Sequence, residues 1–230
     1  MAEEYLTDDE QLEAVKRLAV EYAPWLLGGV LVGAALFFGI RYFQSYTNDR
    51  AYRAATQFGA MTNALEANDH AKSRQIADGL IRDYAGSPYA DQARLTLARL
   101  DVDDGQLDKA VAPLTQVMDG SKDSELQQIA RLRLARILTD QGKPDEAIKT
   151  LAAPMPAAFA ARYHEVRGDA YFAKKDIPGA LSEYQAALGA ADASGINAAL
   201  LELKIQDLGA VLPPPVAKAA SADTTNKAKP

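Results

Sequence analysis

The sequence predicts an all-α protein in which one N-terminal transmembrane helix is followed by a solenoid of paired helices. Two observations predict this class. The nineteen residues from Tyr22 to Ile40 contain no charged side chain, and as a helix they reach about 28 Å, close to the thickness of the hydrocarbon core of a bilayer. The rest of the chain shows helical periodicity with short polar breaks and no strand-like alternation.

Composition limits the functions that the chain can have. Its 230 residues contain no cysteine, which excludes disulfides, thiol catalysis and a lipid-modified cysteine. Residues 1–21 hold seven acidic and two basic side chains, a net charge of −5, so the other 209 residues contribute −1 to the total of −6. Because nucleic-acid binding needs a basic face, this near-neutral body predicts no nucleic-acid partner.

The first element is a short acidic segment over residues 1–21. Thr7-Asp8-Asp9-Glu10 is a capping box, which typically starts a helix. Apolar residues then recur on one helical face and predict an amphipathic helix over residues 8–21. This helix is either a solvated leader to the span or a segment that docks a partner. An acidic N-terminus and the lack of a small-residue cleavage site after the apolar run argue against a cleaved signal peptide.

The second element is a transmembrane helix over residues 22–43. Trp25 at one end and Tyr42 at the other are typical of side chains at the membrane–water interface, so membrane lipid is an expected partner. A buried core helix is the less favoured alternative. Gly29 and Gly33 form a pattern of small residues that lets two transmembrane helices pack closely. They are candidate contacts with another transmembrane helix, although glycine is common in spans in any case.

The third element, residues 44–212, contains a repeated pattern. After a helix expected from Asn48 to Glu66, alanines recur at intervals of 33, 37 and 33 residues, and we assign them to the second helix of successive pairs: Ala77, Ala110, Ala147 and Ala180. A small residue precedes each of the last three by twelve positions: Ala98, Ala135 and Gly168. A larger residue follows each alanine by four positions: Ile81, Leu114, Leu151 and Tyr184. This pattern resembles the tetratricopeptide repeat, a helix–turn–helix unit of 34 residues.

Small residues let the two antiparallel helices of a repeat approach closely, and the larger residue fills the gap to the next pair. Pro154 and Pro156 interrupt the pattern, so we expect an irregular junction there. The apolar segment 196–212 predicts a last helix that covers the final repeat. The tail over residues 213–230 is rich in Pro, Ala, Lys, Ser and Thr, which predicts disorder.

Catalytic chemistry is not predicted, and neither a cofactor nor a metal is expected. The chain has two histidines, His70 and His164, and a zinc site needs three protein ligands. His164-Glu165 resembles the start of a zinc-protease helix, but no histidine follows four residues later. We therefore interpret His164 as a structural or exposed side chain and expect no enzyme.

Two arginines are candidate contacts with a ligand. Arg99 and Arg136 hold the same place in successive repeats, one residue after the small residue of the first helix. The first helices of stacked repeats line the concave surface of a solenoid, and two arginines there could bind a carboxylate or a peptide backbone. Alternatively, each pairs with a local acid four residues on, Asp103 or Asp140.

Several segments together resemble the YfgM family. They are the block DEQLEAVKR at residues 9–17, the glycine-rich span, RYFQ at residues 41–44, LRLARI at residues 132–137 and RGDAY at residues 167–171. The likeness runs from about residue 8 to residue 212, and its N-terminal block is the most specific part. Members of this family are ancillary subunits of the bacterial SecYEG translocon.

The resemblance implies a single-pass inner-membrane protein with residues 1–21 in the cytoplasm and residues 44–212 in the periplasm. It also implies a PpiD-type membrane-anchored chaperone as a second partner, and a role in handing translocated polypeptides to periplasmic chaperones. Flanking charges do not choose this orientation: Lys16 and Arg17 precede the span, whereas Arg41, Arg50 and Arg53 follow it. The alternative function is a membrane-tethered adaptor that sequesters a soluble regulator.

Overall fold

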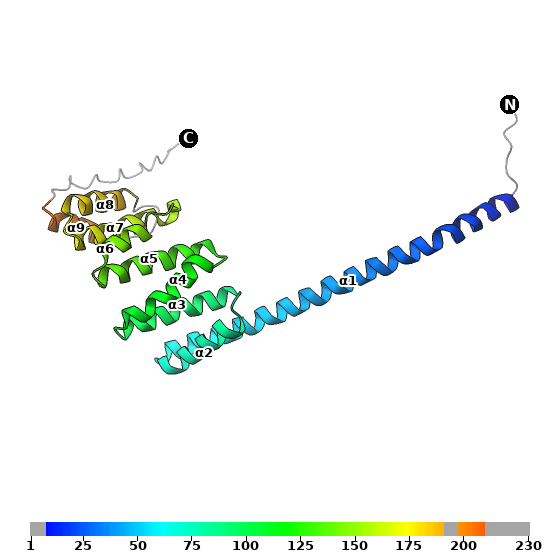
Figure 1. The fold of residues 1–230 in the computed structure, drawn as a ribbon, viewed down its shortest axis with the longest axis horizontal. Coiled ribbons are helices and arrows are strands. Elements are labelled where there is room, and N and C mark those ends of the chain that lie inside the picture. The colour runs from blue at the N-terminus through cyan, green and yellow to red at the C-terminus, as the bar shows by residue number, and fades with distance from the viewer. Residues whose placement is uncertain (1–7, 191–196, 210–230) are drawn as a thin grey trace, which may run out of the picture. The chain divides into compact units, whose positions relative to one another are not determined.

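A computed structural model describes residues 8–190 and 197–209, and in these ranges every regular secondary-structure element is a helix. The chain divides into two compact units, residues 1–89 and residues 90–230. The prediction of an all-α fold with one long apolar N-terminal helix is therefore confirmed (Figure 1). Thr7 of the expected capping box and the tail over residues 213–230 lie outside the described residues.

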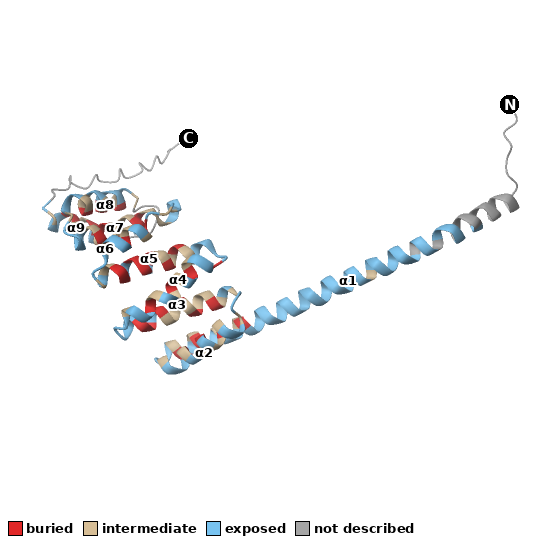
Figure 2. Ribbon diagram, viewed as in Figure 1, coloured by how far each residue is buried: buried red, intermediate tan, exposed pale blue. Residues whose placement is uncertain are grey.

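The first unit is dominated by α1, a single helix of 59 residues (Asp8–Glu66). The helices expected over residues 8–21, 22–43 and 48–66 are thus one continuous element. From Val20 to Tyr52 the large apolar side chains that the structure describes are exposed (Figure 2), and the helix is long and apolar enough to cross a membrane. Such a run of exposed apolar residues is stable in lipid and not in water.

The C-terminal end of α1 is the first part of this helix to become buried. Ala54 and Met61 face α2 (His70–Asp83), which returns antiparallel to α1. Asn68, with φ of 57°, forms the turn, and the Asp69 side chain caps α2 by accepting from the backbone N–H of Lys72. This end of α1 is therefore the first helix of a helical hairpin.

The second unit is built from three further hairpins and a closing helix. Its helices are α3 (Pro88–Asp103), α4 (Leu107–Gly120), α5 (Ser124–Asp140), α6 (Pro144–Thr150), α7 (Ala160–Ala173), α8 (Ile177–Gly189) and α9 (Ala198–Asp207). The hairpin turns place Gly105, Gly142 and Lys175 at positive φ, between 66° and 74°. Glycine suits this left-handed conformation, and Lys175 adopts it at the same place in the last hairpin.

The turns correct one part of the predicted repeat register. Ser73, Ala110, Ala147 and Ala180 each lie four residues after the N-cap of the second helix. In the first hairpin, Ser73 and not Ala77 therefore holds the repeat position that alanine holds in the later hairpins. The apolar pattern missed Ser73 because it is a polar residue that is nevertheless fully buried.

The irregular junction expected at Pro154 and Pro156 is present. Helix α6 has only 7 residues, and a turn followed by a 3-10 helix, η1 (Ala157–Phe159), leads into α7. Helix α9 then buries Leu201 and Ile205 against Ala180 and Tyr184 of α8, as a helix covering the last repeat should.

Candidate functional site: an arginine groove

Two adjoining hollows lie beside α5 in the second unit. The first, of about 250 Å³, is lined by α3, α4 and α5 and includes Arg99 of α3. The second, of about 340 Å³, is lined by α5, η1 and α7 and includes Arg162 of α7. Arg133 and Arg136 of α5 line both hollows. We call the two hollows with these four arginines the arginine groove.

The walls of the groove combine apolar surface with four guanidinium groups and one carboxylate, that of Asp140. Apolar side chains from three helices and η1 line the hollows: Ala98, Val102, Leu114, Ile129, Leu132, Ile137 and Phe159. Arg133 and Arg136 are three residues apart on α5 and share one face, whereas the opposite face of α5 is buried in the core through Ala130, Leu134 and Leu138. Helical periodicity alone therefore directs both guanidinium groups into the groove.

Arg133 combines partial burial with the lack of a carboxylate partner among the described residues. Among the described residues no carboxylate pairs with it, and its Nη1 donates only a long hydrogen bond of 3.4 Å to the backbone oxygen of Leu95. Partial burial lowers the pKa of Arg133, and the like charges of Arg99 and Arg136 lower it further. A bound anion would remove this repulsion.

The two arginines predicted from the sequence both line the groove, and each has an acidic neighbour. Arg99 lies 3.6 Å from the carboxylate of Asp103, four residues on, and both side chains are about half exposed. Arg136 lies 3.8 Å from Glu165 of α7, and among the described residues it forms no ion pair with Asp140, although both line the first hollow. Both pairs are longer than a good charge-assisted hydrogen bond, so these arginines remain available to a ligand.

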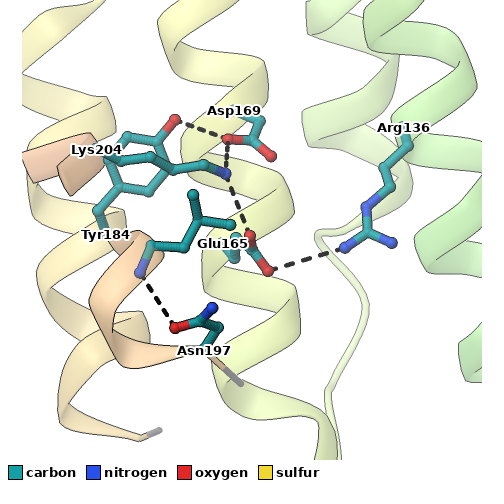
Figure 3. Close-up of polar contacts among 7 residues, drawn as sticks. Arg136, Glu165, Asp169, Tyr184, Asn197 and Lys204 are labelled. Atoms are coloured by element: carbon teal, nitrogen blue, oxygen red, sulfur yellow. Dashed lines mark hydrogen bonds and ion pairs between the residues drawn. The ribbon is translucent and has the colours of Figure 1, made fainter. Parts of the chain in front are cut away.

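The third repeat reverses the charge of this surface. Asp169 follows Gly168 as Arg99 follows Ala98 and as Arg136 follows Ala135. Lys204 of α9 neutralises this end, with Nζ 2.7 Å from Asp169 and 3.2 Å from Glu165 (Figure 3). We call Glu165, Asp169, Lys204 and Tyr184 the acidic end.

Tyr184 completes the acidic end. Its hydroxyl donates to Asp169 at 2.8 Å, and the Lys204 ammonium lies 5.3 Å from the centre of its ring. Burial and the hydrogen bond to Asp169 raise the pKa of Tyr184, so this side chain remains a neutral donor. The carboxylates here are satisfied within the protein, unlike the guanidinium of Arg133.

Sequence reasoning did not identify Arg133, Arg162 or Lys204. Arg133 could have been found, because it lies one helical turn before Arg136. Arg162 and Lys204 could not, since the junction before α7 and the placement of α9 follow no repeat spacing. His164, interpreted as structural, accepts or donates a hydrogen bond of 2.8 Å with Glu183 of α8.

The two predicted contact glycines of α1 lie on free surface. A Cβ atom added at Gly29 or Gly33 would meet no other atom within 4 Å. The described part of the chain therefore leaves this side of the helix open to a second helix.

Comparison with known proteins shows to which family this chain belongs. The family model for a tetratricopeptide repeat-like domain matches residues 16–210. The ancillary SecYEG translocon subunit of Escherichia coli is 32% identical over 206 residues, which cover 89% of this chain and 98% of the relative. The chain belongs to the YfgM family.

Other YfgM relatives support the same assignment. The ancillary SecYEG translocon subunit of Neisseria gonorrhoeae is 28% identical over 208 residues, covering 89% of this chain and 98% of the relative. That of Haemophilus influenzae is 24% identical over 182 residues, 79% of this chain and 89% of the relative. The match includes most of α1 as well as the repeats, and YfgM is not a family of enzymes.

Proposed function

We propose that this protein is a non-enzymatic, single-pass ancillary subunit of the SecYEG translocon in the inner membrane. The observation that carries the proposal is the 32% identity to the Escherichia coli ancillary subunit over 98% of that protein. The exposed apolar surface of α1 supports it, because that surface requires either lipid or another transmembrane helix.

In this proposal residues 1–21 are cytoplasmic, residues 22–43 cross the membrane and residues 44–212 lie in the periplasm. Protease added to spheroplasts should degrade the repeat region and leave the N-terminal segment protected. A repeat region that is degraded only after the membrane is opened would contradict the periplasmic placement.

Contact with the translocon is assigned to the face of α1 that carries Gly29 and Gly33. Replacing both with leucine should reduce co-purification of SecYEG in mild detergent by about tenfold, because close helix packing in lipid depends on small residues. Gly39→Leu is the matched control, since position 39 lies on another face of the helix. An equal loss in the control would contradict the assigned face.

The arginine groove is the proposed binding surface for translocated polypeptides. Its apolar walls suit the apolar side chains of an unfolded segment, and the Arg133 guanidinium, which pairs with no carboxylate among the described residues, suits an acidic one. From here the segment would pass to a PpiD-type membrane-anchored chaperone and then to other periplasmic chaperones.

A photocrosslinking side chain placed in the groove tests this role. At Val102, which lines the first hollow, it should capture secreted polypeptides during active translocation. At Phe172, which is exposed and does not line either hollow, it should capture far less. Equal capture at the two positions, or capture that persists when translocation is blocked, would contradict a role for the groove.

A further inference from the structure

A third hollow, with a polar lining, lies in the first unit, where α1 leaves the proposed span. Its volume is about 270 Å³, and six residues line it: Tyr46, Asp49, Arg50 and Arg53 of α1 with Asp83 and Tyr84 at the end of α2. The four residues from α1 follow the spacing of one helical face. The hollow is a single one, without the adjoining second hollow that extends the arginine groove, and its volume suits a small polar group.

Arg50 fixes the end of α2 beside α1. Its Nη2 donates to the backbone oxygen of Asp83 at 2.7 Å, and its guanidinium lies 5.8 Å from the centre of the Tyr84 ring. The free carbonyl groups at a helix C-terminus favour a cation at this place. The wall formed by α2 is therefore held in position before any ligand binds.

Because α1 is continuous, the distance of the hollow from the membrane can be derived from the helical rise, provided that residues 22–43 form the proposed membrane span. With a rise of about 1.5 Å per residue, Tyr46 lies about 5 Å and Arg50 about 10 Å beyond Phe43, where the span ends. The headgroup layer occupies about 5–8 Å on each side of the hydrocarbon core, and an arginine side chain can extend back toward it. The hollow thus opens at the level of the lipid headgroups.

The charged side chains that line the hollow indicate which charges a bound ligand must carry. The Asp83 carboxylate is held by Arg82, with oxygen–nitrogen distances of 2.9 and 3.2 Å. The hydrogen bond from Arg82 lowers the pKa of Asp83, and the charge of Arg50 lowers it further. Among the described residues, the other charged groups that line the hollow, Arg50, Arg53 and Asp49, form no side-chain ion pair. A purely anionic ligand would be repelled by Asp49, whereas a ligand carrying both charges would satisfy all three side chains.

We propose that this hollow binds the headgroup of a phospholipid with a primary ammonium group, such as phosphatidylethanolamine. The phosphate lies against Arg50 and Arg53, and the ammonium lies against Asp49. The proposal also gives a role to Arg50 and Arg53, which with Arg41 make three arginines after the span, against two basic residues before it. In the proposed orientation this excess opposes the positive-inside rule.

Lipid retention by the full-length protein tests the site. The protein is placed in nanodiscs of phosphatidylcholine, phosphatidylglycerol and phosphatidylethanolamine in equal parts, extracted briefly in mild detergent, and its bound lipid is measured by native mass spectrometry. We expect phosphatidylethanolamine to be retained about tenfold over phosphatidylcholine, the ratio that corresponds to about 1.4 kcal/mol. Equal retention of the three lipids, or a preference for phosphatidylglycerol, would overturn the proposal.

Substitutions test which side chain binds the ammonium group of the lipid and which binds its phosphate. Asp49→Asn should abolish the preference for the ethanolamine headgroup while phospholipid is still bound, and Arg53→Gln should reduce retention of every phospholipid. Arg41→Gln, in the same helix and outside the hollow, is the matched control and should retain the wild-type pattern. A protein that co-purifies through Arg53 in place of lipid would also overturn the assignment.

A carbonate wash of membranes that contain the wild-type protein distinguishes failure of the headgroup site from failure of the proposed function. Protein that remains in membranes washed with carbonate, yet shows no lipid preference, would overturn the headgroup site alone. Protein released by that wash would overturn both the headgroup site and the membrane-anchored function.

Discussion

The arginine groove and the acidic end lie at equivalent positions of successive repeats, but the charged side chains are unpaired at Arg133 in the groove and paired at the acidic end, among the described residues. In the groove Arg133 has no carboxylate partner among the described residues, and partial burial, with a further contribution from its like-charged neighbours, lowers its pKa. At the acidic end Asp169 accepts from both Lys204 and Tyr184. An unsatisfied surface favours a ligand and a satisfied one favours the native fold, which is the basis of our proposal that the groove binds a ligand and the acidic end closes the last repeat.

The same contrast appears in how the helices of each repeat are packed. Near the groove the crossing residues are alanines, Ala98 and Ala135, and the residues sixteen positions later are Leu114 and Leu151, both buried. At the acidic end the pair is glycine and tyrosine. A Cβ atom added at Gly168 would lie 2.5 Å from Tyr184 Cε1. The larger ring at the acidic end is therefore possible only because the crossing residue has no side chain.

Gly168→Ala should produce the largest loss of stability among these changes, about 2–3 kcal/mol, because Tyr184 is buried and cannot move aside without cost. Urea denaturation of the full-length protein in detergent, followed by circular dichroism, measures it. Gly189→Ala is the control, since an added Cβ there meets nothing within 4 Å.

A double variant sharpens the comparison further. Adding Tyr184→Leu to Gly168→Ala recreates the alanine–leucine pair found near the groove and should restore more than half of the lost free energy. The remainder reflects the hydrogen bond from Tyr184 to Asp169. A double variant less stable than Gly168→Ala alone would show that the two positions do not pack as a pair.

Lys204→Met should have the second largest effect on stability, about 1–2 kcal/mol. The methionine keeps the apolar stem of the side chain, but Glu165 and Asp169 lose the cation between them. Hydrogen exchange should accelerate most in α9, which this contact helps to hold on the last repeat. Lys109→Met, at an exposed position, should leave exchange in α9 unchanged, and faster exchange throughout the repeats would contradict a local role for Lys204.

The fold was largely predictable from the sequence because both of its main signals are local. An uncharged run of nineteen residues specifies a span by length and polarity. Turn glycines and small residues at fixed offsets specify the hairpins, since each hairpin folds mainly against its neighbours. The register failed at Ser73, where a buried polar residue replaces the alanine of later repeats and its Oγ has no hydrogen-bond partner among the described residues.

The candidate sites were less predictable because they depend on contacts between repeats. Arg99 and Arg136 were found through their equal repeat positions, which is a local property. Whether Arg136 faces Asp140 or Glu165 depends on the junction between α6 and α7, where two prolines interrupt the period. Lys204 is one of several charged residues of the last helix, and no repeat spacing selects it.

Arg133→Gln should have the smallest effect on stability. The informative result is whether it raises or lowers the free energy of unfolding. Removing one of three neighbouring positive charges should raise the free energy of unfolding by up to about 0.5 kcal/mol at low salt, and this gain should shrink as salt screens the repulsion. The same change should weaken binding of a fluorescent peptide rich in glutamate and leucine by about tenfold, measured by anisotropy. Lys122→Gln, which also removes one exposed positive charge, is the matched control for net charge.

Opposite signs for stability and affinity are the pattern that a binding residue produces, since such a residue is strained without its ligand and satisfied with it. If Arg133→Gln lowered stability and left peptide affinity unchanged, the groove would resemble the acidic end, with its charge satisfied within the fold. A peptide in which lysine replaces glutamate should bind weakly to the wild-type protein and gain affinity in the variant. This reversal would connect the affinity to the charge of Arg133 and not to the shape of the hollow.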